Sequence, residues 1–298
     1  MKQDNQPWYR VNAPSDYKRL YEESVASPEL FWSRVAEEFQ WHQKWDDVVQ
    51  WDFTIPDIKW FVNAKLNITE NCLDRHLETK KDATAIIWES NDPNEEALHI
   101  SYSELHEHVC RFANVLKKYG VAKGDRVCLY MPMIPELAYA VLACARIGAV
   151  HSVVFAGFSA KALADRINDA RARLVLTSDG AFRGNKILNL KDIVDEALEN
   201  CNCVEHVIVT RRTSEQVQMQ PKRDVWLHDE WSHADTSCPA EIMDSEDMLF
   251  ILYTSGSTGK PKGIVHTCGG YMVYADYSFR NVFQYNENDI YWCTADVG

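Results

Sequence analysis

The sequence lacks the features of an exported or membrane-bound protein. No apolar stretch approaches the roughly 18 residues that a membrane-spanning helix needs, and the first residues carry no apolar signal core. The nine cysteines include no C-x-x-C pair and no histidine at zinc-site spacing. We therefore predict a cytoplasmic protein with no membrane partner, reduced and mostly buried thiols, and no metal-ligating residues.

Positive charge is also scarce, since the formal net charge is −13 at pH 7. This balance disfavours nucleic acid and anionic membranes as the main partners. An anionic substrate therefore requires a local basic pocket. The 298 residues, 46% of them apolar, suffice for one large or two ordinary globular domains, and no internal repeat or low-complexity tract is present.

Helical and strand patterns alternate from about residue 102 onward. Leu105, Val109, Phe112 and Leu116 form one face of a predicted helix that ends near Gly120. The predicted strands are continuous apolar runs without polar alternation, and they are separated by helices. This pattern predicts an α/β fold with largely parallel sheets flanked by helices. The predicted helices cover residues 135–147, 159–170 and 188–198, and the predicted strands cover 126–131, 150–155, 174–177, 206–210 and 248–253.

The first sixty residues hold six of the ten tryptophans. Phe31, Val35 and Phe39 recur at helical spacing after a Ser-Pro start signal, which predicts one amphipathic helix that packs against something larger. Residues 213–246 are polar and contain turn residues, so we expect an irregular surface segment there. Residues 290–294 have the pattern of a last strand, and a chain end just after it leaves the sheet unfinished.

Residues 254–263, TSGSTGKPKG, directly follow the apolar run 248–253 and have a phosphate-binding composition. Glycines let backbone N–H groups turn toward an anion, while hydroxyl and lysine side chains supply donors and charge. This is not a Walker A loop, because only two residues separate its glycines and Pro261 follows the first lysine. A solvated Gly/Ser turn is the alternative interpretation. The candidate phosphate ligands are Thr254, Ser255, Gly256, Ser257, Thr258, Gly259, Lys260 and Lys262.

Together with this loop, several segments resemble the acyl-adenylate-forming enzymes, and within them the AMP-forming acetyl-CoA synthetases. The segments are Trp60-Phe61, Leu66-Asn67, 71–76 (NCLDRH), 150–159 (VHSVVFAGFS) and 291–298 (YWCTADVG). The resemblance covers nearly the whole chain. It implies that residues 1–100 are an N-terminal segment packing on the main domain. It also implies that residues 101–298 begin a truncated AMP-binding domain, without its C-terminal lid domain.

The resemblance also implies an activity. Such enzymes are acetate–CoA ligases, which use ATP and Mg²⁺ to join acetate to CoA through an acetyl-adenylate, with release of AMP and pyrophosphate. The loop 254–263 is implied to hold the β- and γ-phosphates. The residues implied to bind CoA are Arg183, Gly184, Asn185, Lys186 and Gly157. The family usually has arginine where this chain has Lys186, so the planar guanidinium fork is lost there.

Enzymes of this kind are much longer than 298 residues, so the resemblance implies an inactive N-terminal fragment. The acyl pocket, the adenine site, the acidic magnesium ligand and the catalytic lysine are expected beyond Gly298, and no catalytic residue is assigned here. Two alternatives stay open: a ligase for propionate or another short acid, and a non-catalytic ATP- or CoA-binding module. His266 and Thr267 could face the nucleotide or pack in the core, whereas Asp296 better fits a strand-end turn.

Overall fold

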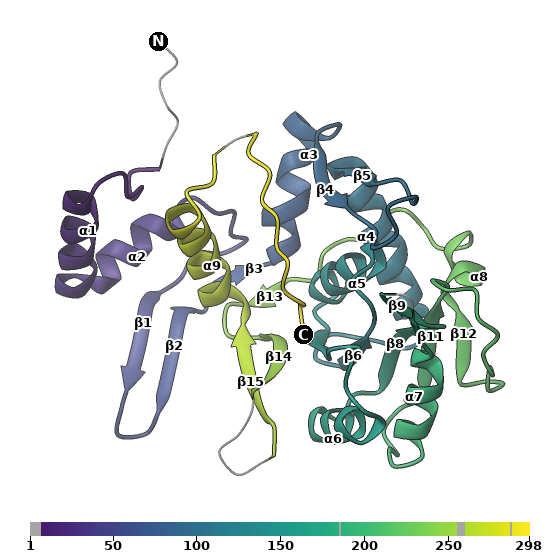
Figure 1. Cartoon of the computed structure of the whole chain (residues 1–298). Helices are drawn as coiled ribbons and strands as arrows, with labels where there is room; N and C mark the ends of the chain where they lie inside the picture. Colours follow the sequence, from purple (N-terminus) through teal and green to yellow (C-terminus); the bar gives the residue numbers. More distant parts are fainter. Residues whose placement is uncertain (1–6, 185, 255–259, 287) are drawn as a thin grey trace. The chain divides into compact units, whose positions relative to one another are not determined.

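The structure, a computed structural model, describes residues 7–184, 186–254, 260–286 and 288–298 (Figure 1). The chain divides into two compact units. The first consists of residues 1–66, 242–247 and 267–294, and the second of residues 67–241, 248–266 and 295–298. The domain boundary expected near residue 100 stays a prediction. No helix among the described residues is long and apolar enough to cross a membrane.

The first unit combines helices with two short antiparallel sheets. Its elements are α1 (Pro14–Ala26), α2 (Pro28–Ala36), α9 (Cys268–Val282), the hairpin of β1 (Asp47–Asp52) and β2 (Asp57–Val62), and the pair of β3 (Lys65–Leu66) and β13 (Met243–Asp244). The predicted amphipathic helix is α2, which ends before Phe39. Its Trp32 ring lies 6.2 Å from that of Trp60 and 5.2 Å from that of Tyr277, so the tryptophans of this unit pack on one another and on α9.

The second unit is built on a seven-stranded sheet with the order β12-β11-β8-β6-β7-β14-β15. Its strands are β6 (Arg126–Tyr130), β7 (Val150–Val153), β8 (Leu174–Ser178), β11 (His206–Thr210), β12 (Asp224–Trp226), β14 (Met248–Thr254) and β15 (Lys262–Thr267). Neighbouring strands from β12 through β14 pair in parallel. The predicted α/β fold with a largely parallel sheet is confirmed.

Helices cover both faces of this sheet because successive side chains of a strand point to opposite faces. Val127 and Leu129 of β6 join the core under α4 (Tyr102–Lys118) and α5 (Pro135–Arg146). Cys128 and Tyr130 join the core under α6 (Ala160–Ala170) and α7 (Leu190–Leu198). Both faces of β6 are therefore buried, as its continuous apolar sequence predicts.

Short elements complete the second unit. They are the π-helix η1 (Glu70–Asp74), α3 (Arg75–Lys80), α8 (Leu227–Trp231), and the antiparallel pairs β4 (Thr84–Trp88) with β5 (Leu98–Ser101) and β9 (Ala181–Arg183) with β10 (Lys186–Leu188).

Two local predictions were wrong. The segment 213–246, expected to be irregular, contains β12, α8 and β13. The three residues of β12 pair in parallel with β11, a partner that so short a segment does not reveal. Residues 290–294, expected to be a strand, form no regular structure. Instead, the Tyr291 ring lies 4.9 Å from the rings of Phe279 and Phe283, so this segment packs by side-chain contact in the first unit.

Candidate functional site

Three predicted site segments follow the carboxyl ends of parallel strands. The Gly157 turn follows β7, the β9–β10 hairpin follows β8, and residues 255–263 follow β14. Parallel strands present their carboxyl ends at one edge of a sheet, so the exits of β7, β8 and β14 lie along the same edge. β7 lies on one side of β6 in the sheet, and β8, the next strand along the chain, lies on the other side of β6. Such a reversal of strand order opens a crevice that binds ligands in α/β proteins.

The β9–β10 hairpin carries two cations at its tip. Arg183 and Lys186 are direct partners across the hairpin, and Gly184 in the turn has the positive φ of 57° that favours glycine. Both cations are exposed, and neither ion-pairs with another residue that the structure describes. Like charges directly opposite each other destabilise a hairpin, and a bound anion relieves that repulsion. Asn185, also predicted to bind CoA, lies outside the described residues.

The buried carboxylate of Asp179 anchors the base of this hairpin. Its Oδ1 atom accepts backbone N–H bonds from Gly180, Arg212 and Thr213, and its Oδ2 atom accepts one from Ser214, at distances of 2.7–3.1 Å. The side chain is fully buried. One carboxylate therefore ties the exit of β8 to the exit of β11, a role that the sequence analysis did not find.

The Gly157 turn is shaped by aromatic residues. The hydroxyl of Tyr130 donates to the carbonyl oxygens of Ala156 at 3.1 Å and Phe158 at 2.6 Å. The rings of Phe155 and Phe158 meet edge to face at 5.5 Å. A Cβ atom on Gly157 would lie 2.3 Å from Cε1 of Phe155, so the close approach of this ring requires glycine.

The phosphate loop is described only at its two ends. Thr254 is the exposed last residue of β14, Lys260 is exposed, and the exposed Lys262 begins β15. The other predicted phosphate ligands, Ser255, Gly256, Ser257, Thr258 and Gly259, lie outside the described residues.

The remaining candidates of the sequence analysis have packing or turn contacts. His266 lies on β15, and its ring stacks on that of Phe250 at 4.4 Å. Thr267 is the N-cap residue of α9 but makes no side-chain cap bond. Asp296 accepts the backbone N–H of Gly298 at 2.8 Å, as in a turn.

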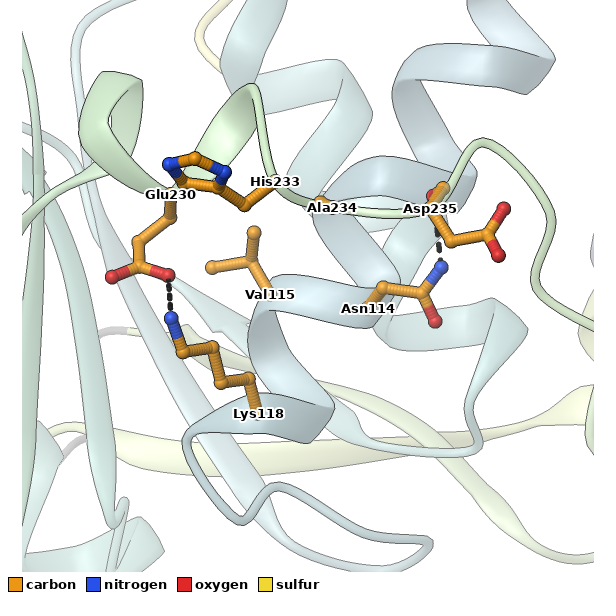
Figure 2. Close-up of a pocket in the computed structure, with 7 residues that line it drawn as sticks. All are labelled: Asn114, Val115, Lys118, Glu230, His233, Ala234 and Asp235. Atoms are coloured by element: carbon orange, nitrogen blue, oxygen red, sulfur yellow. Dashed lines mark hydrogen bonds and ion pairs between the residues drawn. The ribbon is translucent and has the colours of Figure 1, made fainter.

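A small cavity of about 190 Å³ lies elsewhere in the second unit (Figure 2). Glu230 and Lys118 form an ion pair at its wall, and the Asn114 amide donates to the carbonyl of Asp235 at 2.9 Å. Asn114 and Lys118 belong to the last turn of α4, which leads to the amino end of β6. The cavity is smaller than the roughly 300 Å³ of most ligand pockets, and two of its charged groups, Lys118 and Glu230, already pair with each other.

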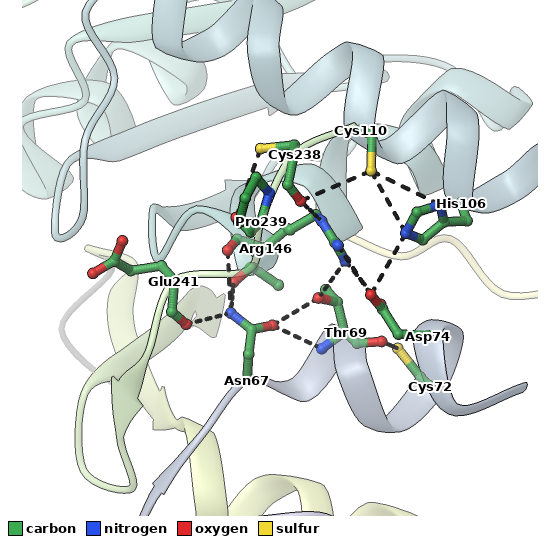
Figure 3. A network of polar contacts seen from close by, with 11 residues as sticks. Asn67, Thr69, Cys72, Asp74, His106, Cys110, Arg146, Cys238, Pro239 and Glu241 are labelled. Atoms are coloured by element: carbon green, nitrogen blue, oxygen red, sulfur yellow. Dashed lines mark hydrogen bonds and ion pairs between the residues drawn. The ribbon is translucent and has the colours of Figure 1, made fainter. Parts of the chain in front are cut away.

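A buried polar network joins the start of the second unit to α5 (Figure 3). The Asn67 amide donates to the carbonyls of Ala145 and Arg146 at 3.1 Å and of Glu241 at 2.8 Å. Arg146 makes a bidentate ion pair with Asp74 at 2.8 and 3.0 Å. This pairing and His106 hold the pKa of Asp74 well below its usual range despite burial, which acts to raise it. Asn67 and Asp74 lie in the resemblance segments, but their contacts could not be derived from the sequence.

The same network contains a cysteine, a histidine and an aspartate in a row, yet it is not a nucleophilic triad. His106 Nε2 lies 3.5 Å from Asp74 Oδ1, and the Cys110 sulfur lies 3.7 Å from Nε2 and 3.9 Å from Nδ1 of the same ring. Cys110 is fully buried, whereas a reactive thiol is at least partly exposed. Hydrogen bonds with Asp74 and Cys110 raise the pKa of His106 to about 9, so its role here is that of a structural cation.

The chain belongs to the AMP-binding enzyme family, whose family model matches residues 73–298. A second model, for the acetyl-coenzyme A synthetase N-terminus, matches residues 17–72. Curated relatives include an acetyl-coenzyme A synthetase from Bdellovibrio bacteriovorus, 54% identical over 95% of this chain, and acetyl-coenzyme A synthetase 2 from Pseudomonas aeruginosa, also 54% identical over 95%. The chain spans 44% of the length of either relative.

A solved structure shares the fold. The acetoacetyl-CoA synthetase from Streptomyces lividans matches with a TM-score of 0.81 and 28% identity, over 89% of this chain and 40% of that chain. The resemblance inferred from the sequence motifs is thereby confirmed.

Proposed function

We propose that the protein carrying this chain is an AMP-forming acetate–CoA ligase that uses ATP, Mg²⁺ and CoA. The observation that carries the proposal is the common edge of the sheet, where a phosphate-type loop and a hairpin with two unpaired cations both emerge. The names of the relatives, acetyl-coenzyme A synthetase, support acetate as the acid. A cytoplasmic location is part of the same proposal.

The reaction has two steps. The acetate carboxylate attacks the α-phosphorus of ATP, and pyrophosphate leaves; the CoA thiolate then displaces AMP from the acetyl carbonyl. Such a reaction depends on positioning and on charge neutralisation rather than on covalent help from the protein. We assign the pyrophosphate charge to Lys260, Lys262 and the hydroxyls of the phosphate loop, and Mg²⁺, when bound with ATP, would neutralise further phosphate charge.

The residues present fit a CoA nucleotide. We assign the 3′-phosphate to Arg183 and Lys186, and their positions as cross-strand partners at the hairpin tip support this assignment. Gly157 leaves room beside the Phe155 ring, and we assign this turn to the pantetheine chain.

The 3′-phosphate assignment is tested by calorimetric titration of the full-length protein with CoA and with dephospho-CoA, which lacks that phosphate. The double variant R183A/K186A is expected to lose most of the preference for CoA. K117A/K123A, which removes two exposed cations at the amino edge of the sheet, is the matched control and is expected to keep it. An unchanged preference in R183A/K186A would contradict the assignment.

The activity is tested by acetate-dependent exchange of labelled pyrophosphate into ATP in the same protein. We expect exchange with acetate to exceed exchange with propionate. A reversed preference would identify propionate or another short acid as the substrate, and no exchange with any short acid would refute the ligase proposal.

A second candidate function concerns the 298 residues themselves, whose β9–β10 hairpin carries both of the cations assigned to the 3′-phosphate. In this case the purified chain binds ATP or CoA but does not catalyse exchange. Titration and exchange measured on the 1–298 chain distinguish the two functions.

A further inference from the structure

The guanidinium of Arg212 lies between two aromatic rings beside the cationic hairpin. Its central carbon is 5.1 Å from the centre of the Trp88 ring and 5.2 Å from that of Phe182. Phe182 belongs to β9 and directly precedes Arg183. Stacking on Phe182 therefore attaches Arg212, which follows β11, to the strand that carries the proposed phosphate ligand.

Glu95 holds Arg212 in this position from a distant part of the chain. Its two carboxylate oxygens each accept one bond from the guanidinium at 2.7 Å, and Ser90 accepts another at 3.2 Å. Bidentate pairing fixes the plane of a guanidinium as well as its place. Bonds to this carboxylate, first from Arg212 and then from the Ser90 hydroxyl, lower the pKa of Glu95 to about 2, so the carboxylate stays ionised at neutral pH.

The base of the hairpin is packed, whereas its outer part is exposed. Ala181 is buried, Leu188 packs against the same core, and Asp179 bonds to the backbone at the base. Phe182 and Ile187, nearer the tip, are 40% and 41% exposed, and an isolated two-stranded hairpin is only marginally stable in water. The stacking of Arg212 on Phe182 therefore supports the part of the hairpin next to Arg183.

We propose that Arg212, oriented by Glu95, is a positioning residue that holds the β9–β10 hairpin so that Arg183 and Lys186 converge on the 3′-phosphate of CoA. This inference rests on the proposed CoA site. Three of the five N–H groups of Arg212 bond to Glu95 and Ser90, and its guanidinium stacks on Phe182, so in this role it acts on the hairpin through Phe182.

The test uses E95Q and R212K in the full-length protein, with calorimetric titration of CoA and of dephospho-CoA. Both variants keep side chains of similar size but lose the bidentate ion pair. We expect CoA affinity to fall by roughly tenfold while the affinity for dephospho-CoA changes little, because a displaced hairpin loses only the phosphate contact. E205Q is the matched control, since Glu205 pairs with Arg173 at 2.6 Å on the amino side of the sheet, and it should leave both affinities unchanged.

Three outcomes separate the inference from the function on which it rests. If the unmodified protein prefers CoA and both variants keep that preference, the positioning role is overturned. If affinity for both ligands falls together with the melting temperature, Arg212 is merely structural, and the role is overturned as well. If the unmodified protein does not distinguish CoA from dephospho-CoA, the proposed site at Arg183 and Lys186 itself fails.

Discussion

Arg146 illustrates how single residues stabilise the second unit. Its side chain is 5% exposed and carries a full charge, which is stable only because Asp74 accepts two of its bonds and the carbonyl of Cys238 a third. Burying a charge without a partner costs several kcal/mol. The loss of Asp74 would leave the Arg146 charge buried without a partner, and this cost exceeds the net stabilisation by the ion pair itself.

We predict that Asp74→Asn lowers the free energy of unfolding by about 2–3 kcal/mol, because it leaves the buried Arg146 charge without its counter-ion. The partial exposure of Asp74, 31%, places the value at the low end for a buried pair. Denaturant unfolding measures the change. Glu23→Gln, which breaks the exposed pair with Arg19, is the control and should cost less than about 1 kcal/mol. Equal losses in the two variants would contradict the prediction.

Gly157 offers a second prediction at this scale. Gly157→Ala forces the Phe155 ring away from the new methyl group, so we expect a stability loss of about 1 kcal/mol and weaker CoA binding. Thermal unfolding and calorimetry give the two readouts. Gly124→Ala is the control, because Gly124 has a φ of 83° and open space around it. This variant should lose similar stability through backbone strain but leave CoA binding intact. Unaltered CoA binding in Gly157→Ala would remove this turn from the site.

At the scale of elements, α6 connects the exits of two strands. The guanidinium of Arg166 on α6 lies 4.6 Å from the ring centre of Phe158, beside the Gly157 turn, and 5.4 Å from that of Tyr253, just before the phosphate loop. Tyr253 also donates its hydroxyl proton to Asp169 of α6 at 2.7 Å. Burial, followed by this bond to a carboxylate, raises the pKa of Tyr253, which keeps the hydroxyl a donor. One helix thus fixes both segments.

We predict that Arg166→Met destabilises the protein by about 1–2 kcal/mol, through loss of two cation–π contacts at a side chain that is 9% exposed. Hydrogen exchange should accelerate at both residue 158 and residue 253. Lys161→Met, at an exposed position of the same helix, is expected to change stability by less than about 0.5 kcal/mol. Faster exchange at only one of the two segments would show that Arg166 does not link them.

At the scale of the whole molecule, two histidines set opposite limits on stability. The pKa of His106 is raised to about 9 by its bonds to Asp74 and Cys110, so its stabilisation is complete below pH 6.5, the unfolded value, and is lost as pH rises through 9. Burial lowers the pKa of His151 to about 4. Its neutral form is favoured in the folded state, so stability falls as pH drops from 6.5 to 4.

We therefore predict maximal stability near pH 6.5, with each limb worth about 2–3 kcal/mol. Unfolding free energies measured between pH 4 and 9.5 test this curve. His106→Gln should flatten the alkaline limb alone, and His151→Phe, which keeps a ring against Phe250, should flatten the acidic limb alone. A limb that persists in its own variant would contradict the assignment of that limb.

Sequence patterns predicted the parallel sheet because β6, β8 and β11 each contain a continuous apolar run, which carries its own signal. They failed where a partner decided the outcome. β12 is a strand because it pairs with β11. Residues 290–294 form no strand, and Tyr291 packs instead against the rings of Phe279 and Phe283. Such contacts have no local signature.

The sequence by itself determined the fold class, the family and the chemistry of the candidate segments, since composition and motifs are local properties of the chain. Only the tertiary structure decided which residues support those segments. Glu95 and Arg212 are 117 positions apart, and Asn67 is 174 positions from Glu241. Contacts between residues so far apart in the sequence form only after the sheet has brought the strand ends together. The sequence contains many polar residues, and no local pattern shows which of them will meet.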